Sequence, residues 1–144
     1  MTDVVAQTVE LEQAREAMDA TPGPRGKGSQ DPLIGDLRRG GLLPLLVLHF
    51  VSREPSYGNQ LIDRIARLTA GALQINPNTM YPLLRQLETR GLIQGEWEHP
   101  ERRSRRFYRI TDAGRAECVR VLEEVEPRLE RIARSIDAIR EELR

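Results

Sequence analysis

The amino-acid sequence predicts a mainly α-helical fold with one small β-hairpin, and three observations support this. Between residues 33 and 91, three successive segments carry leucine, isoleucine and methionine at helical spacing. Residues 93–111 then alternate between apolar and polar side chains, as two short strands do. From residue 112 onward, apolar side chains again recur every three or four positions. The predicted order is therefore helix, helix, helix, hairpin, helix.

Length and composition exclude several classes of protein. The chain has 144 residues, of which 39% are hydrophobic and 31% charged, with a mean hydropathy of −0.51. This fits one domain with appendages and a core shared with a partner subunit. The longest apolar run, residues 42–51, is far shorter than the ~20 residues of a membrane span, and the N-terminus shows no signal-peptide pattern. We expect a cytoplasmic protein that makes no membrane contact.

Changes in composition and in the spacing of apolar residues divide the chain into three parts. Residues 1–32 form an acidic N-terminal arm that ends in the linker TPGPRGKGSQDP, which we expect to be flexible because it is rich in Pro and Gly. The predicted globular domain covers residues 33–111, and a long C-terminal helix covers residues 112–144. The role of the arm stays open.

The first two helices of the domain follow from apolar spacing and turn residues. A strongly apolar helix follows Leu33, and Pro44 should either kink it or mark its first turn. The turn SREPSYG separates it from a second helix, for which we expect Ser56 as the N-cap. That helix ends near Gly71.

A third helix follows after a short β-like link at residues 73–75. Asn76 and Asn78 both qualify as its N-cap. We prefer Asn78, because Pro82 then falls within the first turn, where a missing N–H costs little. Gly91 should end the helix. Strands at residues 93–98 and 105–111 form the hairpin, the wing, and the whole arrangement is a winged helix-turn-helix.

The exposed face of the third helix is a candidate for reading DNA. Its buried stripe should be formed by Met80, Leu83, Leu84 and Leu87. The remaining polar positions carry side chains of the types that bond phosphates and base edges, although any solvated helix face has a similar composition. The candidates are Asn78, Thr79, Tyr81, Pro82, Arg85, Gln86 and Thr89.

The tip of the hairpin carries a dense group of cations. The segment ERRSRRFYR, residues 101–109, holds five Arg and one Glu, a net charge of +4, with Phe107 and Tyr108 among them. Such a tip suits contact with the phosphate backbone or the minor groove, and a solubilising turn is the alternative. The candidate DNA contacts here are Arg102, Arg103, Arg105, Arg106 and Tyr108.

The net charge of the chain is zero, but its charged residues are unevenly distributed along the sequence. The chain carries 22 basic and 22 acidic residues. Residues 1–20 hold one basic and five acidic residues (−4), residues 21–109 hold fourteen and eight (+6), and residues 110–144 hold seven and nine (−2). The predicted domain is therefore basic, as a protein that binds a polyanion should be.

The last helix carries an apolar stripe with a spacing of 3, 4, 3, 4, 3, 4, which is typical of a helix that pairs with a partner helix. We expect self-association through it, and a kink or a restart at Pro127. The stripe consists of Leu122, Val125, Leu129, Ile132, Ile136, Ile139 and Leu143.

No group of residues suggests catalysis, a cofactor or a metal. The single cysteine, Cys118, excludes an intramolecular disulfide and a cysteine-based zinc site. No acid pair stands beside a plausible nucleophile or a glycine-rich phosphate loop. The sequence predicts a protein that is not an enzyme.

Several segments together resemble the PadR family of bacterial transcriptional regulators. They are LLPLLVLHFVSREPSYGNQLI, NPNTMYPLLRQLETRGLI, GEWE and RRFYRITDAGR, within residues 37–118. The resemblance implies a homodimeric winged-helix repressor that binds a palindromic operator and that a small-molecule effector releases in many members. The single C-terminal helix is similar to the small subfamily.

The same resemblance assigns roles to individual residues. Thr79, Tyr81 and Arg85 match the DNA-facing positions of the recognition helix. Tyr57, with Gly58, matches the aromatic-glycine start of the second helix and joins the candidate DNA contacts. Arg105, Arg106 and Tyr108 match the end of the wing. The N-terminal arm lies outside the family pattern, and the last helix lacks the aromatic side chains on which some members stack flat drugs.

A second function hypothesis belongs to a different class. A winged-helix domain without specific DNA binding could use its hairpin and last helix to bind a protein partner. The Arg-rich tip argues against this alternative, and the acidic arm favours it.

Overall fold

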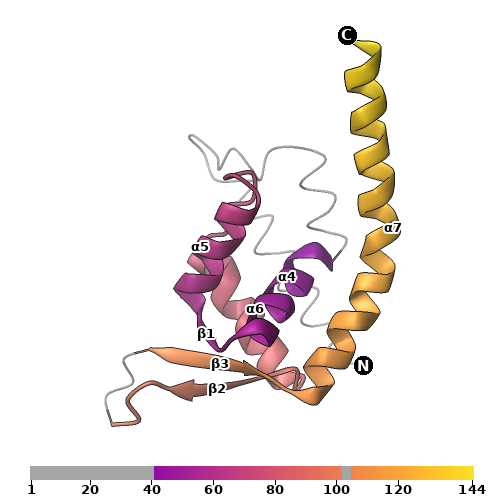
Figure 1. The fold of residues 1–144 in the computed structure, drawn as a ribbon. Coiled ribbons are helices and arrows are strands. Elements are labelled where there is room, and N and C mark those ends of the chain that lie inside the picture. The colour runs from indigo at the N-terminus through magenta and orange to yellow at the C-terminus, as the bar shows by residue number, and fades with distance from the viewer. Residues whose placement is uncertain (1–40, 102–104) are drawn as a thin grey trace.

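A computed structural model of the protein describes residues 41–101 and 105–144. The predicted arm at residues 1–32 lies outside these ranges, as do Arg102 and Arg103 of the hairpin tip. Figure 1 shows the described elements, with a small sheet at one end of the helical body and one long helix along its side.

The described chain contains four helices and one three-stranded antiparallel sheet, which confirms the predicted fold class. The predicted hairpin forms from β2 and β3, with Ile93 opposite Ile110 and Trp97 opposite Arg106. Strand β1 adds to the free edge of β3, so the sheet order is β1-β3-β2. The sequence did not indicate β1, because two residues are too few for an alternating pattern. In chain order the elements are α4 (Leu43–Arg53), β1 (Ser56–Tyr57), α5 (Gly58–Leu68), α6 (Pro77–Thr89), β2 (Ile93–Trp97), β3 (Arg106–Ile110) and α7 (Asp112–Glu142).

Helix α4 is the centre of the core. It lies against α7, α5 and β3, which explains why its sequence is apolar on nearly every side. Pro44 falls in its first turn, the second of the two positions predicted for it. The core is completed by α5, α6 and the link between them, where Leu73 and Ile75 are buried without forming a strand.

The start of α5 differs from the prediction. Its N-cap is Tyr57, whose backbone N–H donates to the Gln60 side chain at 2.9 Å. Ser56 is fully buried in β1, and its hydroxyl donates to the Glu54 carbonyl and accepts from Arg64. The serine hydroxyl is thus used in the turn and is not available to cap the helix.

The start of α6 also differs from the preferred prediction. Asn76 is the N-cap, and its side-chain oxygen accepts the N–H of Asn78 at 2.7 Å. Pro77 takes the first helical position, where its fixed φ suits the helix and its missing N–H removes nothing. At the other end, Gly91 adopts φ +75°, and the Leu92 N–H bonds the Leu87 carbonyl, as predicted for the helix stop.

Helix α7 begins at Asp112, as predicted, with Thr111 as its N-cap. It runs without interruption through Pro127, so of the two expectations there, a kink or a restart, the restart is wrong. Its first half packs on the domain, with Val121 and Val125 buried and Leu129 partly buried against the core. Its second half extends beyond the helical body (Figure 1). There Ile136, Ile139 and Leu143 are 39%, 58% and 80% exposed.

The predicted seam of α7 is therefore divided between two environments. Val125 and Leu129 pack within their own chain, which corrects the expectation that the whole stripe faces a partner helix. The spacing did not separate the two cases, because a helix places residues three and four apart on one face whatever covers that face.

Candidate nucleic-acid interface

Helix α6 presents a narrower polar face than the sequence suggested. Asn78, Arg85 and Thr89 are exposed, but Thr79 and Gln86 retain only 2% and 6% of their exposure. Both buried residues lie beside Leu83 on the helix surface, on the edge of the apolar stripe. The expectation that Thr79 and Gln86 are exposed, and so free to contact DNA, is wrong.

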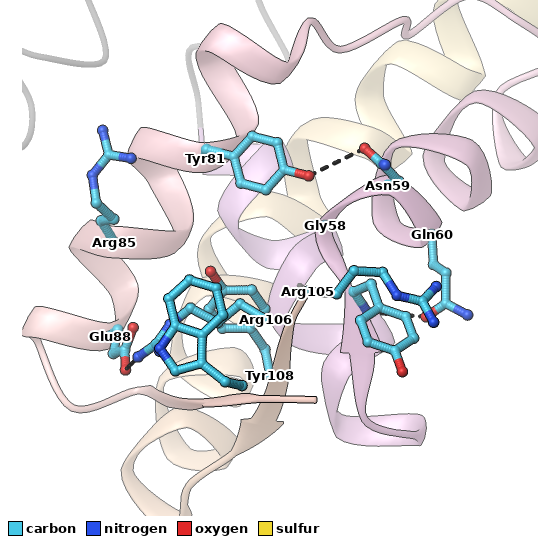
Figure 2. Close-up of a pocket in the computed structure, with 11 residues that line it drawn as sticks. Gly58, Asn59, Gln60, Tyr81, Arg85, Glu88, Arg105, Arg106 and Tyr108 are labelled. Atoms are coloured by element: carbon cyan, nitrogen blue, oxygen red, sulfur yellow. Dashed lines mark hydrogen bonds and ion pairs between the residues drawn. The ribbon is translucent and has the colours of Figure 1, made fainter. Parts of the chain in front are cut away.

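Tyr81 connects α6 to the start of α5. Its hydroxyl donates to the Asn59 side chain at 3.1 Å (Figure 2). Its ring lies against Gly58, where a Cβ atom would come within 2.7 Å of the ring. The absence of a side chain at Gly58 therefore leaves the space that the ring of the half-buried Tyr81 occupies.

A cleft of about 660 Å³ opens between α6, the start of α5 and the hairpin, shown in Figure 2. Asn78 and Thr79 are not among the residues that line it. Sequence reasoning missed four of its lining residues, Asn59, Gln60, Glu88 and Trp97, because they come from three elements and share no local pattern. The cleft brings together six of the predicted site residues: Tyr57, Tyr81, Arg85, Arg105, Arg106 and Tyr108.

Arg105 lies on the outer side of this cleft. Its guanidinium donates to both carboxylate oxygens of Glu98, at 2.8 and 3.0 Å, and covers the Tyr57 ring at 4.2 Å. These hydrogen bonds hold the pKa of Glu98 below its ordinary value. The Arg105 side chain is 58% exposed, and an exposed ion pair of this kind contributes little to stability.

Arg106 is less exposed than Arg105 and pairs with a carboxylate from a different element. Its Nη2 atom lies 2.6 Å from the Glu88 carboxylate of α6, and the two side chains are each 29% exposed. Tyr108, predicted as a DNA contact, is only 3% exposed, and burial raises the pKa of its phenol. Alternation along β3 directs the Tyr108 ring toward the core, so little of this side chain is exposed for the predicted contact.

Arg85 differs from these two wing arginines. It is exposed on α6, it lines the cleft, and its guanidinium forms no ion pair or hydrogen bond with any of the described residues. Figure 2 shows its side chain extending away from α6 into solvent. Of the cleft arginines, Arg85 is the one whose charge is not already neutralised by a described carboxylate.

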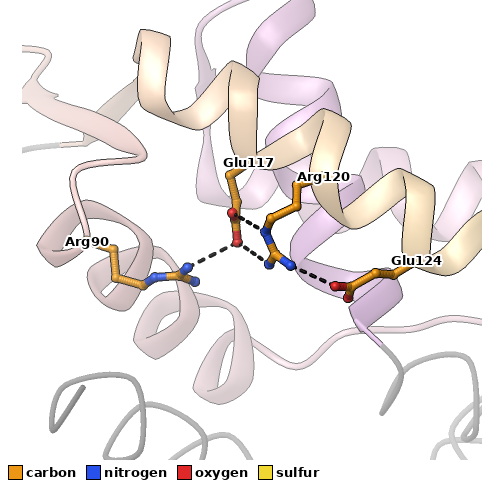
Figure 3. Close-up of polar contacts among 4 residues, drawn as sticks. All are labelled: Arg90, Glu117, Arg120 and Glu124. Carbon is orange, nitrogen blue, oxygen red and sulfur yellow. Dashed lines mark hydrogen bonds and ion pairs between the residues drawn. The ribbon is translucent and has the colours of Figure 1, made fainter.

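The far end of α6 is tied to α7 by a group of four charged residues (Figure 3). Arg90 donates to Glu117 at 3.1 Å, and Arg120 donates to both oxygens of Glu117 at 2.8 Å and to Glu124 at 2.8 Å. The hydrogen bonds from Arg120, followed by those from Arg90, lower the pKa of Glu117 to about 2. Helix α6 is thus fixed at this end to the long helix.

Within the described ranges, no three His, Cys, Asp or Glu residues are grouped so that they could hold a metal ion. Burial raises the pKa of the half-buried Cys118, so its thiol is not activated. None of the described helices has the length and apolar character needed to cross a membrane.

Three helices packed under a small sheet, with a hairpin beside the third helix, define a winged-helix protein. The sequence model of the family described as "Transcriptional regulator PadR-like family" matches residues 47–120, just over half of the chain. The chain belongs to this family. It is accordingly a transcriptional regulator and not an enzyme.

Individual relatives agree with this assignment. The chain is 35% identical over 92 residues to the protein named transcriptional regulator Rv3488 of Mycobacterium tuberculosis, covering 64% of this chain and 79% of that one. It is similar to a PadR family transcriptional regulator of Eggerthella lenta, with 37% identity, a TM-score of 0.51, and coverage of 74% and 88%. A transcriptional regulator of Clostridium thermocellum matches with 27% identity, a TM-score of 0.61, and coverage of 69% and 93%.

Proposed function

We propose that this protein is a homodimeric repressor that binds a palindromic operator. In this proposal α6 enters the major groove and the hairpin lies along the neighbouring phosphate backbone. The observation that carries it is Arg85, an exposed and unneutralised guanidinium beside a cleft that the wing arginines also line. Arg is the residue best suited to bidentate contact with guanine or phosphate.

The exposure and the ion pairs of the site residues decide which role in DNA binding we assign to each. Asn78, Tyr81 and Arg85 on α6 contact bases or the adjacent phosphates. Arg105 contacts a phosphate, which is feasible because its exposed pair with Glu98 is weak enough to exchange. Thr79 and Tyr108 are not assigned DNA contacts, because both are buried.

The dimer is supported by the exposed apolar residues in the second half of α7. A two-fold dimer would place two copies of α6 about one turn of DNA apart, roughly 34 Å, which explains a palindromic site. Release by a small-molecule effector stays a prediction.

The first experiment titrates the protein into labelled duplex from its own upstream region, with scrambled duplex as the control, at several salt concentrations. We expect tight, sequence-dependent binding with a steep salt dependence. Arg85→Ala should weaken specific binding by about tenfold or more and reduce discrimination between the two duplexes.

Arg131→Ala is the matched control for charge. Arg131 is exposed on α7, on the side opposite its apolar stripe, so its loss removes the same charge far from the cleft. It should leave DNA binding unchanged. If wild type bound both duplexes equally weakly, and selection from genomic fragments found no preferred site, the domain would instead serve a protein partner.

A further inference from the structure

Glu88, in the last turn of α6, contacts both strands of the wing. Its Oε2 atom accepts a hydrogen bond from Nη2 of Arg106 in β3 at 2.6 Å. The same oxygen accepts the backbone N–H of Gly95 in β2 at 3.1 Å. Figure 2 shows Glu88 and Arg106 directed toward each other between the helix and the hairpin. One carboxylate thus joins the recognition helix to each strand of the hairpin.

Gly95 leaves the space through which Arg106 reaches Glu88. A Cβ atom on Gly95 would lie 2.6 Å from Nε and 2.9 Å from Cζ of Arg106, closer than real Cβ contacts occur. Trp97, on the same face of β2, lies opposite Arg106, with its ring centroid 5.2 Å from the guanidinium carbon. Gly95 and Trp97 therefore form a seat that directs Arg106 toward Glu88.

Both partners of the Glu88–Arg106 pair are partly shielded from solvent. Each side chain is 29% exposed, whereas in the other wing ion pair Arg105 is 58% and Glu98 27% exposed. Partial burial weakens solvent screening, and loss of either partner leaves the charge of the other without its bond. Loss of Glu88 also leaves the Gly95 N–H without its acceptor. Arg106, predicted from the sequence as a phosphate contact, already has its guanidinium bound to a carboxylate.

We propose that Glu88 and Arg106 are positioning residues that fix the wing against α6, so that helix and hairpin meet DNA as one preorganised surface. This role deepens the proposed DNA-binding function and rests on it. It makes an acidic residue, which by itself repels DNA, necessary for DNA binding.

Charge removal and loss of positioning change the DNA affinity in opposite directions, so a variant of Glu88 tests the proposal. Glu88→Gln removes a negative charge from the DNA-facing side, and by charge alone it would tighten binding. The positioning role requires the opposite, a loss of about tenfold in affinity for the specific duplex. The matched control is Glu96→Gln, which removes the same charge from an exposed position of β2 that has no ion pair or hydrogen bond among the described residues. This control should bind DNA as well as wild type or more tightly.

Two measurements report the position of the wing on α6 in the absence of DNA. Trp97 is the only tryptophan of the chain, so its fluorescence reports the seat of Arg106 directly. In Glu88→Gln, quenching of Trp97 by acrylamide should increase, and the Gly95 amide should exchange its hydrogen faster than in wild type, since the neutral amide oxygen of Gln is a weaker acceptor than the carboxylate. Glu96→Gln should change neither. These results separate the two proposals: if wild type bound no specific duplex, the fluorescence and exchange would still decide whether the pair fixes the wing.

The salt dependence of binding separates positioning from phosphate contact. Arg106→Gln should weaken binding as much as Glu88→Gln does, with an unchanged salt slope, whereas loss of a phosphate contact would lower the slope by about 0.9. The proposal would be overturned if Glu88→Gln bound DNA as tightly as wild type with unchanged Trp97 quenching, or if Arg106→Gln lowered the salt slope by about 0.9.

Discussion

The arginines of residues 101–109 look alike in the sequence but differ in what they contact. Arg105 pairs with Glu98 at the surface, Arg106 is held by Glu88 from another element, and the side chain of Arg109 lies over Phe107. Composition alone predicted one basic patch. Because the carboxylate partners come from α6 and from the residue that follows β2, the roles of these arginines depend on how the hairpin folds and packs on the helix.

Gly114 is a residue at which a single methyl group should disturb the fold. A Cβ atom there would lie 2.0 Å from the backbone carbonyl oxygen of Leu92, which cannot rotate away. Gly114→Ala should therefore lower the free energy of unfolding by about 3 kcal/mol, at the upper end for overpacking. Urea unfolding at fixed protein concentration measures this loss. Ala116→Ser, an exposed change in the same turn, should alter stability by less than about 0.5 kcal/mol.

At the scale of elements, α6 is bounded by charged contacts at its last turn. Glu88 joins it to the wing, and Arg90 joins it to α7 through Glu117. The helix was predicted from its apolar stripe and its terminal glycine, and the leucines of the stripe are buried as predicted. Its polar face was predicted too wide, since a stripe of four apolar residues does not show how far neighbouring elements cover the flanks. Thr79 and Gln86 are the residues so covered.

The contact between α6 and α7 should make stability depend on pH. The folded-state pKa of Glu117 is about 2, below its ordinary value of 4.5, so the ionised carboxylate favours the folded state. This contribution is complete above the unfolded pKa and is lost as the pH falls from about 4.5 to about 2.

Glu117→Gln tests this dependence. Allowing for solvent screening, it should reduce the free energy of unfolding by about 1 kcal/mol at neutral pH. Its difference from wild type should shrink toward zero as the pH approaches 2, as urea unfolding at constant protein concentration can measure. Glu123→Gln, an exposed position on the same helix with no ion pair among the described residues, should show no such trend. A pH-independent difference would contradict the assignment to Glu117 ionisation.

At the scale of the whole molecule, the second half of α7 extends an apolar stripe beyond the domain. We expect this half to form the dimer contact, and Ile139→Asp should convert the dimer into monomer, because it would bury a charge in the interface. Light scattering after size-exclusion chromatography measures the mass. The matched control is Ala138→Asp, which places the same charge on the opposite side of the same turn and should leave the dimer intact. A dimer that survives Ile139→Asp would place the interface elsewhere.

The sequence by itself determined the order of the helices, the hairpin, the start of α7 and the family, because these depend on local periodicity, turn residues and short motifs. Tertiary structure decided which polar residues are free. Thr79 and Tyr108 are buried, Arg106 is bound to Glu88, and Arg85 keeps its charge exposed. It also divided the α7 stripe between the chain's own core and an uncovered surface. The physical reason is the same in each case: burial and pairing depend on residues distant in the chain, which no local pattern records.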